Sequence, residues 1–290
     1  MKSFLVSILL IQSTFAQADI VLHDDTRTEI RLAGPAKRII SLAPNITEMV
    51  YAAGAGEHLV GAVDFSDYPV AAHKLPRVGS YARVDIEAIV ALKPDLVLAW
   101  ESGTPPASVA QLRKLKIPVF VVEPKRIADV ARDIERYGQL AGTDAIAKTS
   151  AADFRERHER LKNRYAGKPP VRMFYQVWDE PLMTVNGKQV ISDVIRLCGG
   201  KNVYAELPAI APTVSVESVL AENPDVIVAG GMGASSAAWL DQWRRWPRLN
   251  ATAKNQLFFI DPNLLQRHTP RLLDGAEQLC ARLEQARNKP

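Results

Sequence analysis

Five aromatic side chains stand on predicted loops at the ends of predicted strands. Phe65, Tyr68, Tyr81 and Trp100 follow or separate strands expected in the first half of the chain, and Trp178 follows one in the second half. In open α/β sheets, ligands bind beyond the carboxyl ends of the strands. Aromatic rings at that edge suit a large, flat, partly apolar ligand. Half-buried packing is the alternative interpretation of each ring taken singly.

Two carboxylates recur at equivalent places in an internal repeat. Residues 84–100 read VDIEAIVALKPDLVLAW, and residues 214–229 read VSVESVLAENPDVIVA, so the offset is 130 residues. Each copy predicts a short helix, a break at proline and a buried strand. Glu87 and Glu217 fall in the predicted first helical turns. The helix dipole stabilises an acid there without any partner, so a role in recognition and a purely local role both remain open.

Enzymatic motifs are absent from the sequence. It contains neither a Gly-x-Ser-x-Gly elbow nor a phosphate-binding loop with its lysine. The five histidines are scattered and form no cluster with metal-ligand spacing. They are His23, His58, His73, His158 and His268. We therefore expect no catalytic residues, no metal site and no cofactor, and a secreted enzyme is the distant alternative.

The first 18 residues have the pattern of a secretory signal peptide. Lys2 gives a basic start, Phe4–Ile11 is apolar, and Ala16-Gln17-Ala18 is a small-x-small cleavage pattern. We expect cleavage near Ala18 and a soluble, exported product. A buried N-terminal strand is the alternative. No later segment is long and apolar enough to span a membrane.

The net charge and the cysteine content limit the possible partners and indicate a disulfide. The formal net charge is +4, which is too small to argue for nucleic acid or an anionic membrane as a partner. A hydrophobic content of 47% over 290 residues supports one large core or two smaller ones. In an oxidising compartment, Cys198 and Cys280 most simply form one disulfide. Two unpaired buried thiols are the alternative.

Predicted strands and helices alternate in both halves, so the fold class is α/β with mostly parallel sheets. We divide the chain into a signal peptide (1–18), an N-terminal α/β lobe (19–125), a helical connector (126–166) and a C-terminal α/β lobe (167–290). A run from about Asp144 to Tyr165 predicts one long bridging helix, roughly 30 Å at 1.5 Å per residue. Between two similar lobes we expect a ligand cleft.

The local pattern also predicts individual elements. A small hairpin is expected within 19–35, and Asn45 or Thr47 is expected to cap a helix that ends at Gly54. Strands are expected at 39–42, 59–63, 96–99, 119–122, 171–177 and 257–260, and the terminal helix at 270–287.

The sequence resembles the periplasmic cobalamin-binding proteins that deliver to ABC importers. These belong to a wider class that also receives haem and ferric siderophores. The resemblance covers essentially the whole chain after the signal peptide. Its segments are RIISLAPNITE, VGAVDFSDYP, IEAIVALKPDLVLAW, LCGGKNV and the closing TPR…QLC.

The resemblance carries several implications. It implies a periplasmic, monomeric binding protein with two lobes and one bridging helix, in which Cys198 and Cys280 are bonded. It implies that Glu87 and Glu217 dock onto Arg residues of the permease of an ABC importer, and the repeat supports that role because both acids occupy the same place. The implied ligand-binding residues for cobalamin, or a related corrinoid, are Pro44, Phe65, Tyr81, Trp100, Met183 and Arg267.

The sequence also departs from the pattern expected of cobalamin receptors. Ala211 stands where a Trp is expected, Met183 replaces a Phe, Tyr81 replaces a Trp and Asn263 replaces an Asp. The second lobe therefore contributes fewer aromatic side chains to the expected ligand cleft. A differently substituted corrinoid, haem or a ferric siderophore remains the alternative cargo, and for haem Tyr81 would have to ligate the iron.

Overall fold

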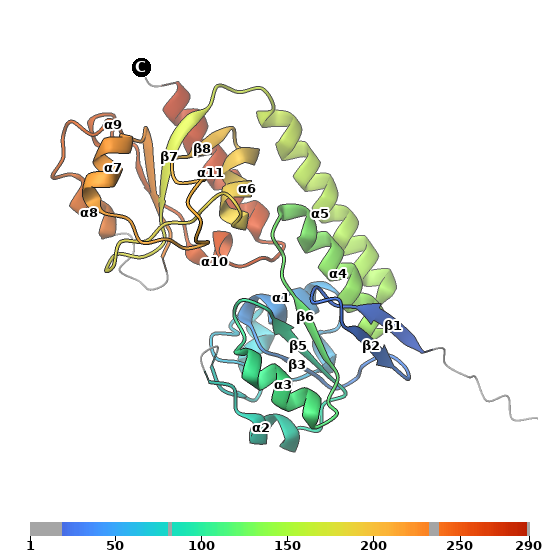
Figure 1. Cartoon of the computed structure of the whole chain (residues 1–290). Helices are drawn as coiled ribbons and strands as arrows, with labels where there is room; N and C mark the ends of the chain where they lie inside the picture. The colour runs from blue at the N-terminus through green and yellow to red at the C-terminus, as the bar shows by residue number, and fades with distance from the viewer. Residues whose placement is uncertain (1–18, 81–82, 232–237, 289–290) are drawn as a thin grey trace, which may run out of the picture.

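The protein folds into two α/β lobes joined by a pair of helices (Figure 1). The structure is a computed structural model that describes residues 19–80, 83–231 and 238–288. The predicted signal peptide and Tyr81 lie outside the described residues. Within the described part, no helix is long and apolar enough to cross a membrane.

The first lobe is built on a four-stranded parallel sheet in the order β4-β3-β5-β6. Its strands are almost entirely apolar and buried, as a sheet covered on both faces requires. The strands are β3 (Ile39–Ser41), β4 (Leu59–Ala62), β5 (Leu96–Trp100) and β6 (Val119–Val122). The helices are α1 (Pro44–Ala52), α2 (Ile86–Ala91) and α3 (Pro106–Lys114), with 3₁₀ turns η1 (Gly56–His58) and η2 (Val70–Lys74).

The second lobe repeats this topology with the order β10-β9-β7-β8, again all parallel. Its strands are β7 (Val171–Gln176), β8 (Gly200–Asn202), β9 (Val226–Ala229) and β10 (Leu257–Phe259). Its helices are α6 (Val190–Leu197), α7 (Val216–Glu222), α8 (Trp239–Trp243), α9 (Asn250–Ala253), α10 (Pro262–Leu265) and α11 (Leu272–Arg287). Strands β3, β4, β5 and β6 thus correspond to β7, β8, β9 and β10. The two-lobe α/β prediction is confirmed.

One local prediction was wrong, and one strand was not predicted. Helix α1 begins at Pro44, and its N-cap is Ala43 with no side-chain cap, because Pro at the first helical position loses no needed N–H. Thr47 instead donates its hydroxyl to Ser41 Oγ at 2.9 Å. Strand β8 was missed because its sequence, Gly-Lys-Asn, has no apolar pattern; its pairing with β7 defines it.

The connector consists of α4 (Ile127–Ala141) and α5 (Asp144–Tyr165). Helix α4 ends at Ala141, and its C-cap is Gly142, whose φ of 70° is left-handed and suits glycine. A Cβ at Gly138 would lie 2.2 Å from Cβ of Ala147, so glycine lets the two helices touch. Helix α5 then extends from beside the first lobe to the second (Figure 1).

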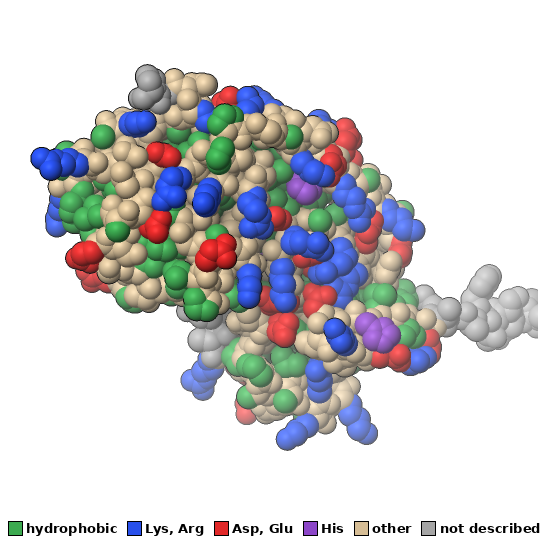
Figure 2. All heavy atoms as spheres, turned by 45° about the horizontal axis from the view of Figure 1, so that its top comes forward, with side chains coloured by type: hydrophobic (Ala, Val, Ile, Leu, Met, Phe, Trp, Pro, Cys, Tyr) green, Lys and Arg blue, Asp and Glu red, His purple; other side chains and the backbone are tan. Residues whose placement is uncertain are grey.

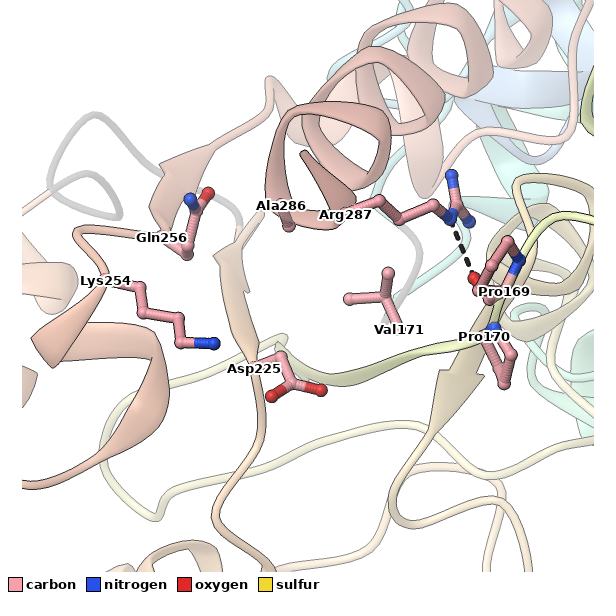
Figure 3. A pocket seen from close by; sticks show the side chains of 8 residues that line it. All are labelled: Pro169, Pro170, Val171, Asp225, Lys254, Gln256, Ala286 and Arg287. Carbon is pink, nitrogen blue, oxygen red and sulfur yellow. Dashed lines mark hydrogen bonds between the residues drawn. The ribbon is translucent and has the colours of Figure 1, made fainter. Parts of the chain in front are cut away.

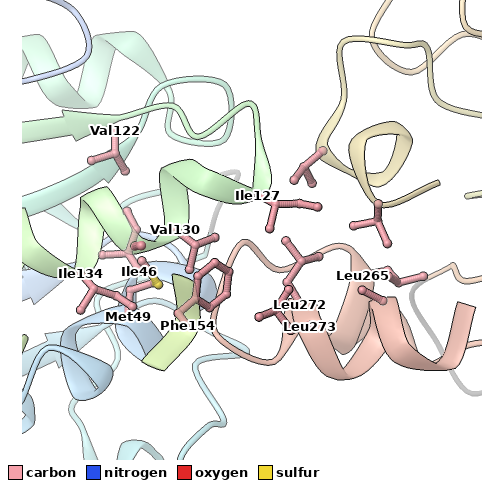
Figure 4. Close-up of a cluster of buried hydrophobic side chains, with 14 of the residues drawn as sticks. Ile46, Met49, Val122, Ile127, Val130, Ile134, Phe154, Leu265, Leu272 and Leu273 are labelled. Atoms are coloured by element: carbon pink, nitrogen blue, oxygen red, sulfur yellow. The ribbon is translucent and has the colours of Figure 1, made fainter. Parts of the chain in front are cut away.

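One apolar cluster runs through both lobes and the connector (Figure 4). Ile46 of α1, Val130 of α4 and Phe154 of α5 are all buried in it. From the second lobe, Leu265 and Leu272 pack into the same cluster. The lobes therefore share buried apolar surface beneath the cleft, which stabilises their relative placement.

The chain ends are fastened to this framework. The expected N-terminal hairpin is present as β1 (Ile20–His23) and β2 (Glu29–Leu32). Its Asp25 accepts from Arg136 of α4 at 2.8 Å. At the other end, a disulfide joins Cys198, after α6, to Cys280 of α11, and both cysteines are fully buried. The expected disulfide is confirmed.

Candidate functional site

A hollow of about 360 Å³ lies between the two lobes. Pro44 at the start of α1 and Trp100 at the end of β5 line it from the first lobe. Pro262, Gln266 and Arg267, in and after α10, line it from the second. Most of the exposed lining is apolar. The hollow lies beyond the carboxyl end of β5, where open α/β sheets bind ligands.

Trp100 forms one wall of the hollow, and its indole ring lies against the turn that follows β5. A Cβ at Gly103 would lie 2.1 Å from the indole ring, so only glycine fits at this turn. The Trp100 backbone N–H donates to Thr104 Oγ1 at 3.1 Å and closes the turn. Across the lobe boundary, the ring centroid of His268 lies 5.8 Å from that of Trp100. Burial lowers the pKa of His268 to about 4, so its imidazole is uncharged at neutral pH.

Arg267 brings a charge to the hollow and is neutralised across the cleft. Its Nη1 donates to Asp67 Oδ1 of the first lobe at 2.6 Å. Burial alone would raise the pKa of Asp67, but the hydrogen bond and charge of Arg267 outweigh that effect and hold the pKa below its usual range. The pair therefore offers directed N–H groups without a net charge.

Phe65 stands on the loop that Arg267 holds. Its φ of 62° is left-handed, which is uncommon for a residue with a side chain and is typical of functional sites. Its side chain is among the most exposed apolar groups of the described chain, at 69%. The next residue, Ser66, is fully buried and bonded to Thr47 Oγ1 at 3.0 Å. The loop is thus anchored at Ser66 while the Phe65 ring is free to meet a ligand.

The structure brings together three of the six predicted ligand-binding residues in one hollow: Pro44, Trp100 and Arg267. Phe65 is linked to this group through Arg267, which donates to its carbonyl at 3.3 Å. Met183 does not line the hollow. It pairs with the backbone at Trp178, where its N–H bonds the Trp178 carbonyl at 3.1 Å.

The remaining loop aromatics have other contacts. Tyr68 lies under the guanidinium of Arg271, 3.8 Å from ring centroid to Cζ. Trp178 packs edge-on against Trp239 at 5.9 Å. Neither lines the hollow, and both keep exposed surface, at 43% for Tyr68 and 41% for Trp178.

Sequence reasoning missed Pro262 and Gln266 as lining residues. Gln266 is fixed by donating its amide to the carbonyl of Gly230, a contact between segments far apart in the chain. Two signals lay nearby in the sequence. The Asp-Pro pair at 261–262 marks a helix start, since Asp261 caps α10 through the N–H of Asn263 at 2.9 Å. Asn263, named above as a departure from the cobalamin receptors, lines the hollow between Pro262 and Gln266.

Glu87 and Glu217 are placed identically in their lobes. Glu87 follows Asp85, which caps α2 by accepting from the N–H of Ala88 at 3.0 Å. Glu217 follows Ser215, which caps α7 in the same way at 3.1 Å. Both glutamates are exposed, and neither has an ion pair within the described ranges. In Figure 1, α2 and α7 lie at the outer ends of their lobes, away from α5.

A second hollow, of about 270 Å³, lies at the opposite end of the second lobe (Figure 3). Of its two cations, Arg287 is already engaged, because Nε donates to the Pro169 carbonyl at 2.7 Å and Nη2 to that of Gly199 at 2.9 Å. Asp225 is likewise engaged by the N–H of Arg172 at 3.2 Å. The side chains of Lys254 and Gln256 also line it and have no hydrogen-bond or ion-pair partner among the described residues. No aromatic ring lines this hollow, so it is a weaker candidate for a large, flat ligand than the interlobe one.

Charges of both signs are interspersed on the surface, and some form ion pairs. On the face drawn in Figure 2, Lys and Arg side chains are interspersed with Asp and Glu. On α5, Arg157 pairs with Asp274 at 2.6 Å and Arg155 with Glu135 at 2.6 Å. Among the residues that the structure describes, no three acidic, histidine or cysteine side chains converge as a metal site would need.

Two lobes with matching parallel sheets, a shared helical connector and an apolar hollow between them define a two-lobe binding protein. The model of the periplasmic binding protein family matches residues 39–264, so the chain belongs to this family. It is 38% identical over 256 residues to the vitamin B12-binding protein of Vibrio cholerae, covering 88% of this chain and 92% of the relative.

Solved structures give the same result for the fold. The crystal structure of the periplasmic vitamin B12 binding protein BtuF of Vibrio cholerae matches with a TM-score of 0.83 and 38% identity, covering 88% of this chain and 99% of that one. The periplasmic heme-binding protein RhuT from Roseiflexus matches with a TM-score of 0.75 and 23% identity, covering 87% and 99%. The second likeness concerns the fold alone.

Proposed function

We propose that this protein captures a corrinoid, cobalamin, in the interlobe hollow and delivers it to an ABC importer of the inner membrane. The observation that carries the proposal is the hollow itself, where Pro44 and Trp100 from one lobe meet Arg267 from the other. An apolar wall with a few directed donors suits a large ring with polar substituents. The relatives named as vitamin B12-binding proteins support the same cargo.

The role is that of a carrier in the periplasm. Export would follow from the signal pattern in residues 1–18, and removal of that segment would leave a mature chain that begins near Asp19. The match to the periplasmic binding protein family and the mostly apolar lining of the hollow support transport rather than catalysis as the function of this site. Delivery would use Glu87 and Glu217, whose exposed carboxylates suit Arg forks on a permease.

Calorimetry of residues 19–290 with cyanocobalamin tests the cargo. We expect a one-to-one complex with a Kd below about 1 µM, which corresponds to a binding free energy of about −8 kcal/mol or stronger. Trp100→Ala should weaken binding by at least tenfold, since it removes a wall of the hollow. Absence of binding heat at high micromolar cyanocobalamin would contradict the proposal.

Hemin is the competing cargo, and the same protein tests it by absorption spectroscopy. A shift of the Soret band on adding hemin, abolished by Tyr81→Phe, would identify haem as the cargo instead. An unchanged Soret band together with cyanocobalamin binding would support the corrinoid.

A further inference from the structure

Two arginines of the second lobe, Arg267 and Arg271, hold one loop of the first lobe. We call residues 65–69 (FSDYP) the clasped loop. We propose that Asp67 is a positioning and specificity residue of the cleft: its ion pair with Arg267 fixes the Phe65 wall before cargo arrives and disfavours carboxylate-bearing cargo. The part of this inference that concerns cargo rests on the proposed function.

The contact joins two residues of the clasped loop to one guanidinium. Nη1 of Arg267 donates to Asp67 Oδ1 at 2.6 Å, and Nη2 donates to the Phe65 carbonyl at 3.3 Å. The Arg267 side chain is only 14% exposed, while that of Asp67 is 44% exposed. Because a guanidinium is a rigid planar fork, donating to both groups sets the orientation of the loop backbone relative to the second lobe.

Phe65 needs such support because its backbone is strained. At a φ of 62°, an L residue keeps its conformation only where its surroundings impose it. The first lobe holds the neighbours: Arg77 donates to the Ser66 carbonyl at 3.0 Å and to that of Val63 at 3.3 Å. The carbonyl of Phe65 itself is held from the second lobe by Arg267. The orientation of the exposed ring therefore depends on the second lobe.

A separate clamp keeps the lobes together without Asp67. Arg271 donates from Nε and Nη2 to the two carboxylate oxygens of Glu48 at 2.8 and 2.6 Å. It also covers the ring of Tyr68. Removing the charge of Asp67 thus perturbs the clasped loop and leaves this clamp and the buried interlobe cluster in place.

The ion pair also determines which charge the cleft accepts. With Asp67 beside it, Arg267 presents N–H groups but little net positive charge. A cargo carboxylate that approached Arg267 would meet the Asp67 carboxylate, and like charges at short range repel. Neutral amide substituents can accept from Arg267 without that repulsion. The pair therefore favours an amide-bearing ring over an anionic porphyrin.

The test compares Asp67→Asn with Asp64→Asn. Asp64 immediately precedes the clasped loop, and its carboxylate has no ion pair within the described residues. Hydrogen exchange of the cargo-free protein reports the placement of residues 64–69. We expect Asp67→Asn to raise exchange in this segment by about two- to fivefold, the range for a partly exposed ion pair. The Asp64→Asn protein should exchange as the unmodified protein does.

The Kd values for two cargoes supply a second readout. A purely structural role of Asp67 would not change them in opposite directions. Asp67→Asn should raise the Kd for cyanocobalamin by about two- to fivefold and lower the Kd for hemin by a similar factor. Unchanged loop exchange, or equal weakening for both cargoes, would overturn the proposal. If the unmodified protein bound neither cargo, the proposed function would fall, and the exchange result would still confirm or overturn positioning by Asp67.

Discussion

Arg38 and Arg172 make equivalent hydrogen bonds in the two lobes. Each donates its guanidinium to a carbonyl at the end of the helix that precedes the central strand: Arg38 to Leu92 at 2.6 Å and Arg172 to Glu222 at 2.7 Å. The two acceptors are 130 residues apart, the offset of the sequence repeat. The repeat is therefore a repeat of tertiary contacts, and it sets α2 and α7, with their glutamates, in equivalent positions.

The paired glutamates lead to a prediction about transport. Glu87→Ala combined with Glu217→Ala should leave cyanocobalamin affinity unchanged and lower uptake on the order of tenfold, because exposed acids that meet Arg forks set docking register and rate. Uptake by cells that lack their own binding protein measures this. Asp153→Ala with Glu206→Ala removes two other exposed acids and serves as the charge-matched control. Normal uptake with the first pair would exclude the docking role.

Gly103→Ala tests the Trp100 wall. The added methyl would overlap the indole ring, and a crowded site relieves such overlap by moving the ring at a cost of about 1–3 kcal/mol. We expect cyanocobalamin affinity to fall by roughly tenfold in calorimetry. Gly167→Ala adds a methyl where no atom lies within 4 Å. Its φ of 69° strains the backbone locally, but Gly167 does not line the hollow, so affinity should stay unchanged. Equal affinities for the two variants would show that the ring is not held as described.

His268 makes stability depend on pH. Burial lowers its pKa from 6.5 to about 4 in the folded state, so between these values the unfolded chain binds a proton that the folded chain does not. Stability is therefore lost as pH falls from 6.5 towards 4. From pH 7 to pH 4.5 this loss amounts to roughly 2 kcal/mol. In urea unfolding at pH 7 and pH 4.5, the free energy of unfolding of His268→Gln should fall by about 2 kcal/mol less than that of the unmodified protein. Equal decreases for the two proteins would contradict the assignment.

Arg271→Ala should destabilise the protein more than an ordinary surface change. It would leave Glu48, which is 3% exposed, as a buried unpaired carboxylate, a situation that costs about 3–5 kcal/mol. Arg157→Ala is the matched control, since its partners Asp274 and Glu277 are largely exposed and such pairs contribute about 0–1 kcal/mol. Chemical unfolding measures both, and equal losses would count against the clamp.

The disulfide ties α6 to the terminal helix across 82 residues of chain. Replacing Cys198 and Cys280 by Ala should lower the free energy of unfolding by about 2–5 kcal/mol, because the unfolded chain gains the freedom that the bond removes. Unfolding of the unmodified protein with and without reductant gives the comparison. A loss below about 1 kcal/mol in both experiments would contradict this prediction.

Local patterns were sufficient for the elements that bury apolar faces. The strand around Val97, the long helix α5 and the repeat could all be predicted, since burial imposes a periodicity on the chain and a break such as Pro94 ends it. The three-residue strand β8 could not, because its small and polar residues leave no such trace.

The site was predictable in its residue types and not in its geometry. Pro44, Trp100 and Arg267 were named from the resemblance, but the pairing of Arg267 with Asp67 joins residues 200 apart, and that of Arg271 with Glu48 joins residues 223 apart. Charged side chains carry no periodic signal of their partners, which are decided by how the shared core sets one lobe against the other. The sequence alone determined two similar α/β lobes, the aromatic residues at the ends of their strands and the two repeated glutamates. Only the tertiary structure decided which side chains meet across the cleft, because those contacts depend on packing between segments distant in the chain.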